Sequence, residues 1–241
     1  MKISAVTIAQ NEEGCIGDCI SSVKDYVDEH VVVDGGSTDN TVNIAKSLGA
    51  IVYHNDFTMA SHKKNFANQK NFGIVKATYD WILIIDSDEM LEASLLSKFS
   101  VLIDDMPHPH KQMPIQCFLF PRKNYYNDDP DDKDPATMFN WPDYQRMLFR
   151  NYCRFEGRIH EQLTGFACEA RTPISAGSIL HRKSTKRQQQ QDDLYFELRP
   201  TDYRDRLGND AVMLQRIKEG VYKHDPRVER LARDWFPHAF D

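Results

Sequence analysis

The hydrophobic pattern of the first 90 residues predicts strands that alternate with helices. In chain order, strand-like and helical segments alternate at residues 3–9, 15–27, 30–34, 41–48, 50–54, about 59–77 and 81–86. This alternation is typical of a parallel, doubly wound sheet. Because crossovers between parallel strands are right-handed, the carboxyl ends of all four strands should meet at one rim.

The fourth strand-like segment, WILIIDSDEM at residues 81–90, changes abruptly from apolar to acidic. Its continuous apolar part is typical of a strand that is covered on both faces. The acids that follow, Asp86, Asp88 and Glu89, should therefore emerge together at the rim. Ligands of open α/β sheets bind outside the carboxyl ends of the strands, so this rim is the expected functional site.

The second half of the chain is less regular. The expected segments are a helix near 91–104, a loop at 108–114, a strand at 115–122, an acidic and aromatic loop at 124–144, strand-like residues 146–150, the segment 155–163, and a final strand at 175–183. From Ser184 onward the composition is polar with amphipathic spacing, which predicts a helical tail. We therefore expect a main domain at 1–184 and a helical extension at 185–241.

Composition limits the classes of protein that remain. With 241 residues, 41% hydrophobic and 27% charged, the chain has room for one soluble α/β domain and an appendage. A net charge of -6 gives no general attraction to nucleic acid or anionic membranes. The short, quickly acidic N-terminus does not resemble a signal peptide, and no apolar run approaches a membrane span. The five cysteines lack zinc-site spacing, so we expect reduced thiols in a cytoplasmic protein.

The acids at the rim indicate a cation. Asp86 and Asp88 should point into one pocket, where they repel each other unless a positive charge joins them. Oxygen ligands suit Mg²⁺ or Mn²⁺, although a helix N-terminal cap explains Asp88 and Glu89 nearly as well. At the second strand end, Asp34 lies in VVVDGGSTDNT, whose glycine spacing does not match dinucleotide folds. Asp34 is therefore expected to accept a hydrogen bond from a base or ribose.

Together these motifs resemble a known family. The series is TIAQNEE, VVVDGGSTDNT, KNFANQKNFGIVKATYDWILIIDSDE, WPDYQRMLFRN, RFEGRIHEQL and SILHRKS. It resembles the inverting family 2 glycosyltransferases of the GT-A fold, and most of all the branch that includes lipopolysaccharide-core β-glucosyltransferases. The resemblance covers about residues 1–184. It implies a Rossmann-like, mixed but mainly parallel sheet flanked by helices, which transfers a sugar from a nucleotide-diphosphate sugar, a UDP-sugar, to a hydroxyl group with the help of a metal ion.

The resemblance also implies roles for individual residues. The nucleotide-sugar pocket would contain Ala9, Gln10, Asn11, Glu12, Asp34, Lys70, Asn71, Asp86, Ser87 and Arg182. Mn²⁺ or Mg²⁺ would be held by Asp86, Asp88 and His181. Glu161 would be the base that removes the acceptor proton, with Asp143 as the alternative. Without the resemblance, Glu161 reads equally well as a loop acid paired with Arg158.

Several alternatives stay open at this point. A sugar nucleotidyltransferase would need a Gly-rich basic loop after the first strand, which AQNEEG does not provide, and a binding module without turnover is the non-enzymatic alternative. Arginines recur every four residues at 146, 150, 154 and 158, but residues 146–150 read as a strand, which favours separate roles. The acceptor could be a glycan, a lipid-linked saccharide, a protein side chain or a modified nucleobase. The aromatic residues that could stack on a sugar or nucleobase, or equally pack within the loop, are Tyr125, Tyr126, Phe139 and Trp141.

Overall fold

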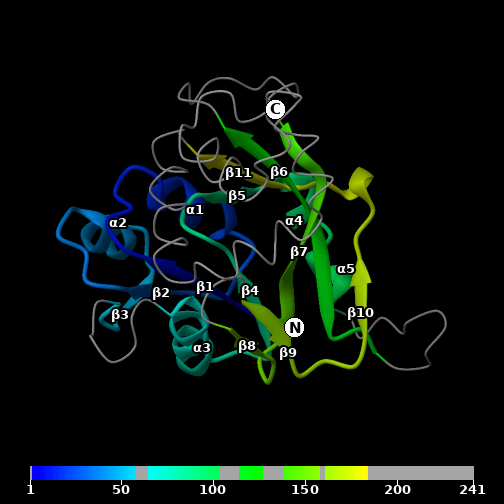
Figure 1. The fold of residues 1–241 in the computed structure, drawn as a ribbon, viewed down its shortest axis with the longest axis horizontal. Helices are drawn as coiled ribbons and strands as arrows, with labels where there is room; N and C mark the ends of the chain where they lie inside the picture. The colour runs from blue at the N-terminus through cyan, green and yellow to red at the C-terminus, as the bar shows by residue number, and fades with distance from the viewer. Residues whose placement is uncertain (1, 58–64, 104–113, 127–137, 158–160, 184–241) are drawn as a thin grey trace, which may run out of the picture. The chain divides into compact units, whose positions relative to one another are not determined.

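The computed structural model describes residues 2–57, 65–103, 114–126, 138–157 and 161–183. Within them, nine strands form one sheet in the order β3-β2-β1-β4-β7-β6-β11-β5, with β10 beside β6 (Figure 1). The strands are β1 (Ile3–Ala9), β2 (Glu29–Asp34), β3 (Ile51–His54), β4 (Trp81–Ile84), β5 (Glu89–Leu91), β6 (Cys117–Tyr126), β7 (Met138–Arg150), β10 (Glu169–Arg171) and β11 (Ile179–Lys183). A separate hairpin joins β8 (Arg154–Glu156) to β9 (Gln162–Thr164).

The first four strands confirm the predicted parallel sheet. Strand β1 pairs in parallel with β2 and with β4, and β2 pairs in parallel with β3. In this register Ala9 lies opposite Asp34, and Val6 lies opposite Ile84. The turns that follow β1, β2 and β4 therefore share one rim.

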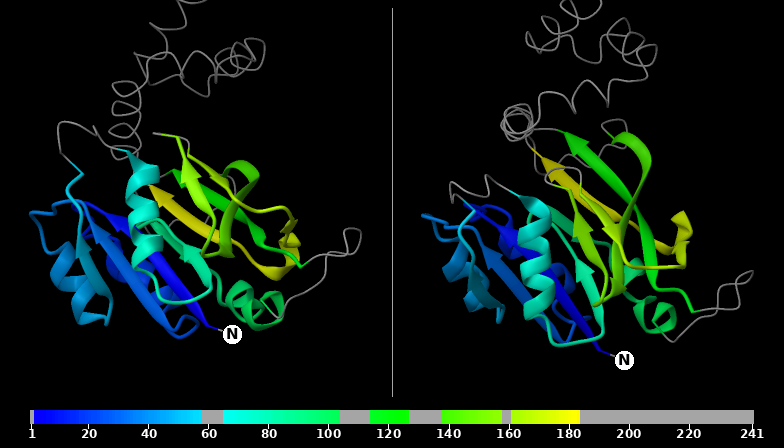
Figure 2. Two further views of the ribbon diagram at one scale, coloured as in Figure 1. Left: turned by 90° about the horizontal axis from the view of Figure 1, so that it is seen from below. Right: turned by 60° about the horizontal axis from the view of Figure 1, so that its bottom comes forward.

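Helices cover both faces of the parallel strands (Figure 2). They are α1 (Ile16–Val23), α2 (Thr41–Ser47) and α3 (Phe66–Lys76), and the short helices α4 (Ala93–Leu96) and α5 (Phe99–Leu102) follow β5. Helix α1 lies on the face that carries Thr7, whose hydroxyl is 3.9 Å from the Cys19 sulfur. Helix α3 packs on the opposite face of β1 and β2, where Gly73 faces Val6 and Val33.

Helix α3 approaches the sheet closely at Gly73. A Cβ atom at this position would lie 2.5 Å from Val6 Cγ1 and 2.9 Å from Val33 Cγ2, closer than side chains can pack. The absence of a side chain at residue 73 thus sets the separation between α3 and the sheet. Helix α3 begins after Asn65, whose side chain accepts a hydrogen bond from the Asn68 amide at 2.9 Å. The predicted start near residue 59 lies outside the described residues.

The second half of the sheet is mostly antiparallel. Strand β7 lies between β4 and β6 and is antiparallel to both. The prediction of a loop at 124–144 was wrong where the structure describes it, because β6 continues to Tyr126 and β7 begins at Met138. Pairing with a neighbouring strand satisfies the backbone of these polar residues, which overrides their loop-like composition. Residues 127–137 of that segment lie outside the described residues.

The second half of the chain also differs from the prediction elsewhere. The single helix at 91–104 is replaced by β5, α4 and α5, because β5 pairs with β11. The segment 155–163, to which no secondary structure was assigned from the sequence, contributes its described ends to β8 and β9. Strand β10 was not predicted, and the last strand begins at Ile179 after a 3-10 turn.

Other sequence-based expectations have more limited outcomes. All five cysteines are free thiols. No helix in the described parts of the chain has both the length and the apolar character needed to cross a membrane. The predicted extension at 185–241 lies outside the described residues, so the domain boundary stays a prediction.

The close approach at Gly73 predicts an unusual response to alanine. Alanine normally stabilises a helix interior relative to glycine, by up to about 1 kcal/mol. Gly73→Ala should instead lower the free energy of unfolding by about 1–3 kcal/mol, because the new methyl group overlaps Val6 and Val33. Urea denaturation would measure this change. Gly14→Ala is the matched control, because nothing lies within 4 Å of its Cβ position. Equal stability of the two variants would contradict the tight packing.

The buried His30 predicts a dependence of stability on pH. Burial lowers the pKa of His30 from 6.5 to about 4, and its Nε2 lies 2.9 Å from the Thr7 hydroxyl. Between these pH values the unfolded chain binds a proton that the folded chain does not. The contribution of neutral His30 to the free energy of unfolding is therefore fully present above pH 6.5. It is lost as the pH falls towards 4, by roughly 3 kcal/mol in total.

Denaturation of the wild type and His30→Gln at a series of pH values would test this. The free energy of unfolding of the wild type should fall more steeply between pH 6.5 and 4. Parallel pH profiles for the two proteins would show that His30 does not titrate as described.

Candidate functional site

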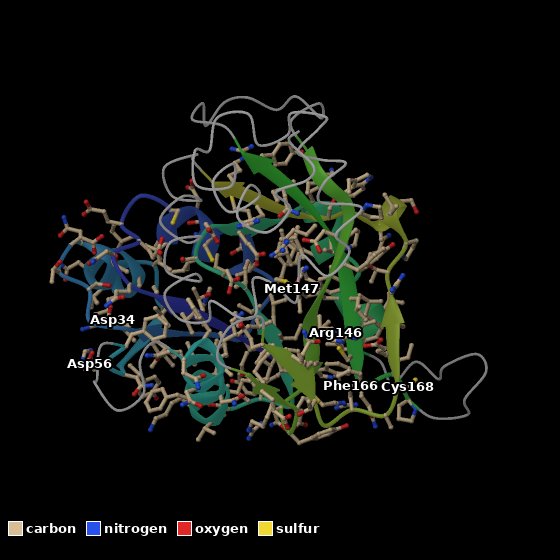
Figure 3. The ribbon with its side chains drawn as sticks, in the orientation of Figure 1. Asp34, Asp56, Arg146, Met147, Phe166 and Cys168 are labelled. Atoms are coloured by element: carbon tan, nitrogen blue, oxygen red, sulfur yellow. The ribbon has the colours of Figure 1, made fainter. Side chains whose placement is uncertain are left out.

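The candidate site lies at the rim where β1, β2 and β4 end. The turn after β1 contributes Gln10, Asn11 and Glu12, and the turn after β2 follows Asp34. The acids after β4 lie beside polar residues of β6, β7 and β11, which the register of the sheet brings to the same region. Figure 3 labels Asp34 on the β2 side of this sheet and Met147 on β7.

Asp34 is held in a fixed, ionised state by the turn that follows it. The backbone amides of Gly36 and Ser37 each donate to its carboxylate at 3.1 Å, and His54 Nδ1 lies 3.3 Å from it. Burial opposes the charge, but the bonds from Ser37, His54 and Gly36 outweigh this effect and lower the pKa of Asp34. The carboxylate is therefore fixed in the geometry of an acceptor.

The residues after β1 mainly join the first turn to the second. The Gln10 side chain donates to the Gly35 carbonyl at 3.0 Å. Asn11 has a φ of 58°, and its side-chain oxygen accepts from the Thr38 amide at 2.8 Å. The Glu12 amide donates to the Thr41 hydroxyl at 2.7 Å. These bonds fix the two turns relative to each other, and Ala9 is buried beneath them.

Lys70 of α3 joins two of the predicted acids. Its ammonium lies 2.6 Å from Glu161 Oε1 and 3.3 Å from Asp86 Oδ1. Burial alone would lower the pKa of Lys70, but Asp86 and Glu161 outweigh it and raise the pKa above its ordinary value. Burial likewise opposes the charge of Asp86, and Lys70 lowers the pKa of that carboxyl. Lys70 therefore stays charged and keeps Asp86 ionised.

Asn71 contacts the protein backbone, whereas the sequence suggested that it faces the donor. Its side-chain nitrogen donates to the Phe155 carbonyl, and its oxygen accepts from the Phe155 amide, both at 2.8 Å. The pair of bonds ties α3 to β8. Because β9 pairs with β8 and begins immediately after Glu161, this connection also places Glu161 near Lys70.

A second cation, Arg122 of β6, joins Asp143 of β7 to Glu89 of β5. Its Nη2 lies 2.6 Å from Asp143 Oδ2, and its Nη1 lies 3.0 Å from Glu89 Oε1. Asp143 also accepts from Asn124 at 3.1 Å and from Gln145 at 2.6 Å. Burial opposes the charge of Asp143, but Arg122 and these amides lower its pKa.

Sequence reasoning missed Arg122, Asn124 and the structural role of Glu89. Glu89 is 2% exposed, and it accepts a hydrogen bond from the Asp86 amide at 3.1 Å. Burial and the neighbouring Asp86 raise the pKa of Glu89 against the effect of Arg122. The available signal was the spacing of Arg122 and Asn124, because residues two apart share one face of a strand. Glu89 begins a strand, so the helix-cap interpretation was wrong.

The three predicted metal ligands do not form one closed cluster. His181 Nε2 lies 3.4 Å from Asp88 Oδ2, whereas Asp86 is paired with Lys70. Among the described residues, no group of three or more His, Cys, Asp or Glu side chains is arranged to hold a metal ion. The Asp88–His181 pair nevertheless fits part of a coordination shell, since cis ligands of an octahedral ion at about 2.1 Å lie about 3 Å apart. Ser87 is buried between the two acids, and the Arg182 amide donates to the Asp88 carbonyl at 3.3 Å.

The three described arginines of the predicted series have separate environments. Arg146 pairs with Glu169 at 2.7 Å and lies over the Phe166 ring (Figure 3). Arg150 lies 4.3 Å from the centre of the Trp81 ring. Arg154 donates to backbone carbonyls of residues 151 and 153. This arrangement confirms separate roles rather than one basic stripe, and Arg158 lies outside the described residues.

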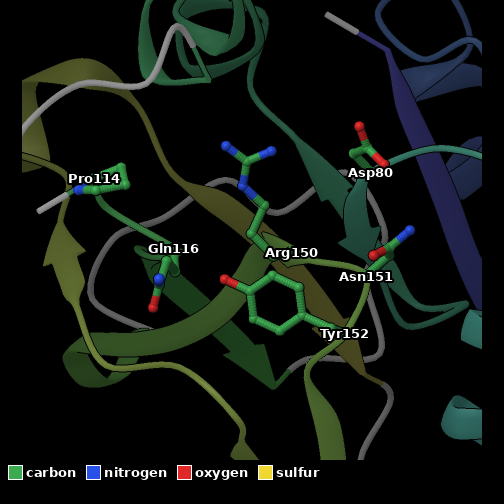
Figure 4. A pocket seen from close by; sticks show the side chains of 6 residues that line it. All are labelled: Asp80, Pro114, Gln116, Arg150, Asn151 and Tyr152. Atoms are coloured by element: carbon green, nitrogen blue, oxygen red, sulfur yellow. The ribbon is translucent and has the colours of Figure 1, made fainter.

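The structure also contains a hollow of about 240 Å³ away from this rim (Figure 4). Its lining consists of Asp80, Pro114, Gln116, Arg150, Asn151 and Tyr152. Asp80 precedes β4, and Arg150 pairs with Trp81 at the start of that strand. The hollow is therefore at the opposite end of β4 from Asp86, and none of the predicted site residues lines it.

Sequence comparison finds relatives that are named as glycosyltransferases. The chain is 44% identical over 94 residues to an uncharacterized glycosyltransferase of Rickettsia typhi, covering 39% of this chain and 30% of the relative. It is 29% identical over 161 residues to the glycosyltransferase SunS of Bacillus subtilis, covering 66% and 34% of the two chains. The alignments thus span about a third of these relatives' own lengths.

Structural comparison gives the same fold. The S. aureus TarS structure in complex with UDP-GlcNAc matches with a TM-score of 0.51 and 17% identity, covering 76% of this chain and 59% of TarS. This likeness identifies the GT-A fold. The family model described as glycosyl transferase family 2 matches residues 4–165, which is most of the chain. The chain belongs to glycosyl transferase family 2.

Proposed function

We propose that the chain is a glycosyltransferase that moves a sugar from a UDP-sugar to a hydroxyl acceptor with inversion at the anomeric carbon. The observation that carries this proposal is the pairing of Lys70 with both Asp86 and Glu161 at the rim of a family 2 fold. This pairing puts a carboxylate that can take a proton next to the acids that follow β4. The UDP donor is motivated by TarS, whose structure contains UDP-GlcNAc.

The donor would bind along the turns that follow β1 and β2. Asp34 is a fixed acceptor there, suited to a base or ribose hydrogen-bond donor. The Gln10–Asn11 turn forms the other wall, because its side chains are bound to the Asp34 turn. Lys70 supplies positive charge beside the acids and limits the repulsion of an approaching diphosphate.

Asp88 and His181 are the residues that would hold Mn²⁺ or Mg²⁺. Their oxygen and nitrogen atoms are 3.4 Å apart, which suits neighbouring positions of one ion. A bound ion would supply positive charge that stabilises the departing nucleoside diphosphate. Asp86 is paired with Lys70, so we propose that it lies beside the metal site and is not a third ligand equivalent to Asp88 and His181.

Glu161 is favoured over Asp143 as the base. Asp143 accepts bonds from Arg122, Asn124 and Gln145, and its lowered pKa makes it a poor proton acceptor. Glu161 contacts Lys70 at 2.6 Å and lies on the segment that immediately precedes β9. Removal of the acceptor proton by a positioned carboxylate is the step that an inverting transfer requires.

The acceptor is proposed only as a hydroxyl-bearing molecule, with a glycan, a lipid-linked saccharide, a protein side chain and a modified nucleobase as the classes to test. The lipopolysaccharide-core branch is a hypothesis within the first two classes. Near the rim, Trp141 lies with its ring 5.8 Å from the Lys123 ammonium, and Tyr125 is buried. Trp141 is therefore the better placed of these two aromatic residues to contact an acceptor. A sugar-nucleotide-binding module without turnover is the alternative that the first experiment separates.

Substitution of the proposed base should reduce turnover. Glu161→Gln should lower kcat for UDP release from a UDP-sugar by about 10²–10⁴-fold, because water or acceptor loses its proton acceptor. The donor KM should change little. Asp143→Asn is the comparison, and its main effect should be on thermal stability because Arg122 loses an ionised partner. Full turnover by Glu161→Gln would exclude it as the base, and no turnover by the wild type with any donor or acceptor would favour the binding module.

Donor binding should depend on the metal and on Asp88. In thermal unfolding, a UDP-sugar with Mn²⁺ should raise the Tm of the wild type, since a ligand that binds only the folded state stabilises it by about 2.7 kcal/mol at 100 times its Kd. Asp88→Ala should abolish the part of the shift that requires Mn²⁺. The control is Asp25→Ala, which removes an exposed acid that is distant from Asp88 in the sequence and should behave as the wild type. An unchanged shift in Asp88→Ala would refute its role.

A further inference from the structure

Two buried polar side chains, Asn124 and His181, continue a line of contacts from the half-buried Asp143. Asn124 Nδ2 lies 3.1 Å from Asp143 Oδ2, and Asn124 Oδ1 lies 2.7 Å from His181 Nδ1. Asn124 is 3% exposed and His181 is 5% exposed, so water does not substitute freely for either contact. The order of these contacts determines where the imidazole carries its proton.

The first contact fixes the orientation of the Asn124 amide. An ionised carboxylate can only accept hydrogen bonds, so the amide nitrogen of Asn124 must face Asp143. Asp143 is kept ionised by Arg122, whose Nε and Nη2 donate to Oδ2 at 2.9 and 2.6 Å. The amide oxygen of Asn124 is thereby directed at His181.

The second contact fixes the proton on His181. An amide oxygen can only accept, so His181 Nδ1 must carry the hydrogen in the 2.7 Å bond. When the ring is neutral, its lone pair is then on Nε2. That atom faces Asp88 Oδ2 at 3.4 Å.

Nε2 and the Asp88 oxygen are then two electron-pair donors at close range. Neither atom can donate a hydrogen bond to the other while the imidazole is neutral. Their 3.4 Å separation is close to the roughly 3 Å between neighbouring ligands of an octahedral divalent ion. Metal-bound histidines commonly donate their other ring nitrogen to an oxygen acceptor in this way.

The strand register produces this arrangement. Asn124 and His181 are partners in the parallel pairing of β6 with β11, so their side chains lie on the same face. The pairing of β6 with β7 shifts from Arg122 opposite Asp143 to Asn124 opposite Phe139. This irregularity leaves Asp143 within reach of both Arg122 and Asn124.

We propose that Asn124, oriented by Asp143, is a positioning residue that fixes His181 in its Nδ1–H form and thereby presents Nε2 with Asp88 as adjacent ligands for a divalent cation. The inference rests on the proposed function, in which this cation serves the donor diphosphate. It assigns Asp143 a role in orienting the metal site.

The test uses Asn124→Leu, which keeps a similar volume but has no hydrogen-bonding group. Long-range ¹H–¹⁵N NMR of the metal-free full chain at about pH 8.5 reports which ring nitrogen of His181 is protonated. The wild type should show Nδ1–H. In Asn124→Leu the proton should move to Nε2, where it can bond to Asp88. The Kd for Mn²⁺ alone, measured by electron paramagnetic resonance of the free ion, should rise about 10–100-fold.

Gln145→Leu is the matched control. Gln145 also donates to Asp143, at 2.6 Å, but neither nitrogen of His181 depends on it. In Gln145→Leu, the His181 tautomer and the Kd for Mn²⁺ should remain those of the wild type. If Asn124→Leu does not fold, Asp143→Leu provides the second variant, because it removes the acceptor that faces the Asn124 amide nitrogen while leaving Asn124 in place. It should give a mixture of tautomers.

The two readouts separate this inference from the proposed function. An Nε2–H form in the wild type, or an Nδ1–H form that Asn124→Leu and Asp143→Leu leave unchanged, overturns the role of Asn124 whether or not Mn²⁺ binds. An Nδ1–H form that responds to the substitutions supports it. If the same wild-type sample then binds no Mn²⁺, the metal dependence in the proposed function fails by itself.

Discussion

The structure of the rim depends on the neutralisation of acids that a buried strand delivers to one place. Asp86, Asp88 and Glu89 follow β4 within four positions of the sequence, and Glu161 and Asp143 join them from other elements. Unpaired carboxylates at such density would repel one another, most strongly where Glu89 is buried. Two cations from different elements prevent this: Lys70 of α3 joins Asp86 to Glu161, and Arg122 of β6 joins Glu89 to Asp143.

These cations also connect the fold to the proposed chemistry. Gly73 lets α3 lie close to β1 and β2, and Lys70 is on the preceding turn of that helix. The next residue, Asn71, binds the backbone of β8 and so fixes the hairpin that carries Glu161. One helix therefore places both the ammonium group and the carboxylate that it contacts. The arrangement would position the Glu161 carboxylate before an acceptor arrives.

The sequence predicted those segments whose hydrophobic pattern matches their burial in the folded protein. The apolar runs that became β1, β2 and β4 and the acids after them gave the parallel sheet and its rim. The sequence did not predict that residues 124–126 and 138–143 are strands, because their polar composition is overridden by pairing with neighbours distant in the chain. The contact of Asn71 with the Phe155 backbone was not predicted for a related reason. A sequence motif can mark Asn71 as important. It cannot show that the Asn71 amide binds the backbone of Phe155, which lies 84 positions away in the sequence.

The network from Glu89 to Asp143 takes its members from four adjacent strands, β5, β11, β6 and β7. A slip of one residue in any of these strands would turn its member to the opposite face of the sheet. The hydrogen bond or ion pair that this member makes with its neighbours would then be lost, which costs free energy at a buried site. The polar network thus penalises incorrect alignments during folding, so that only molecules with correctly assembled strands retain an intact site.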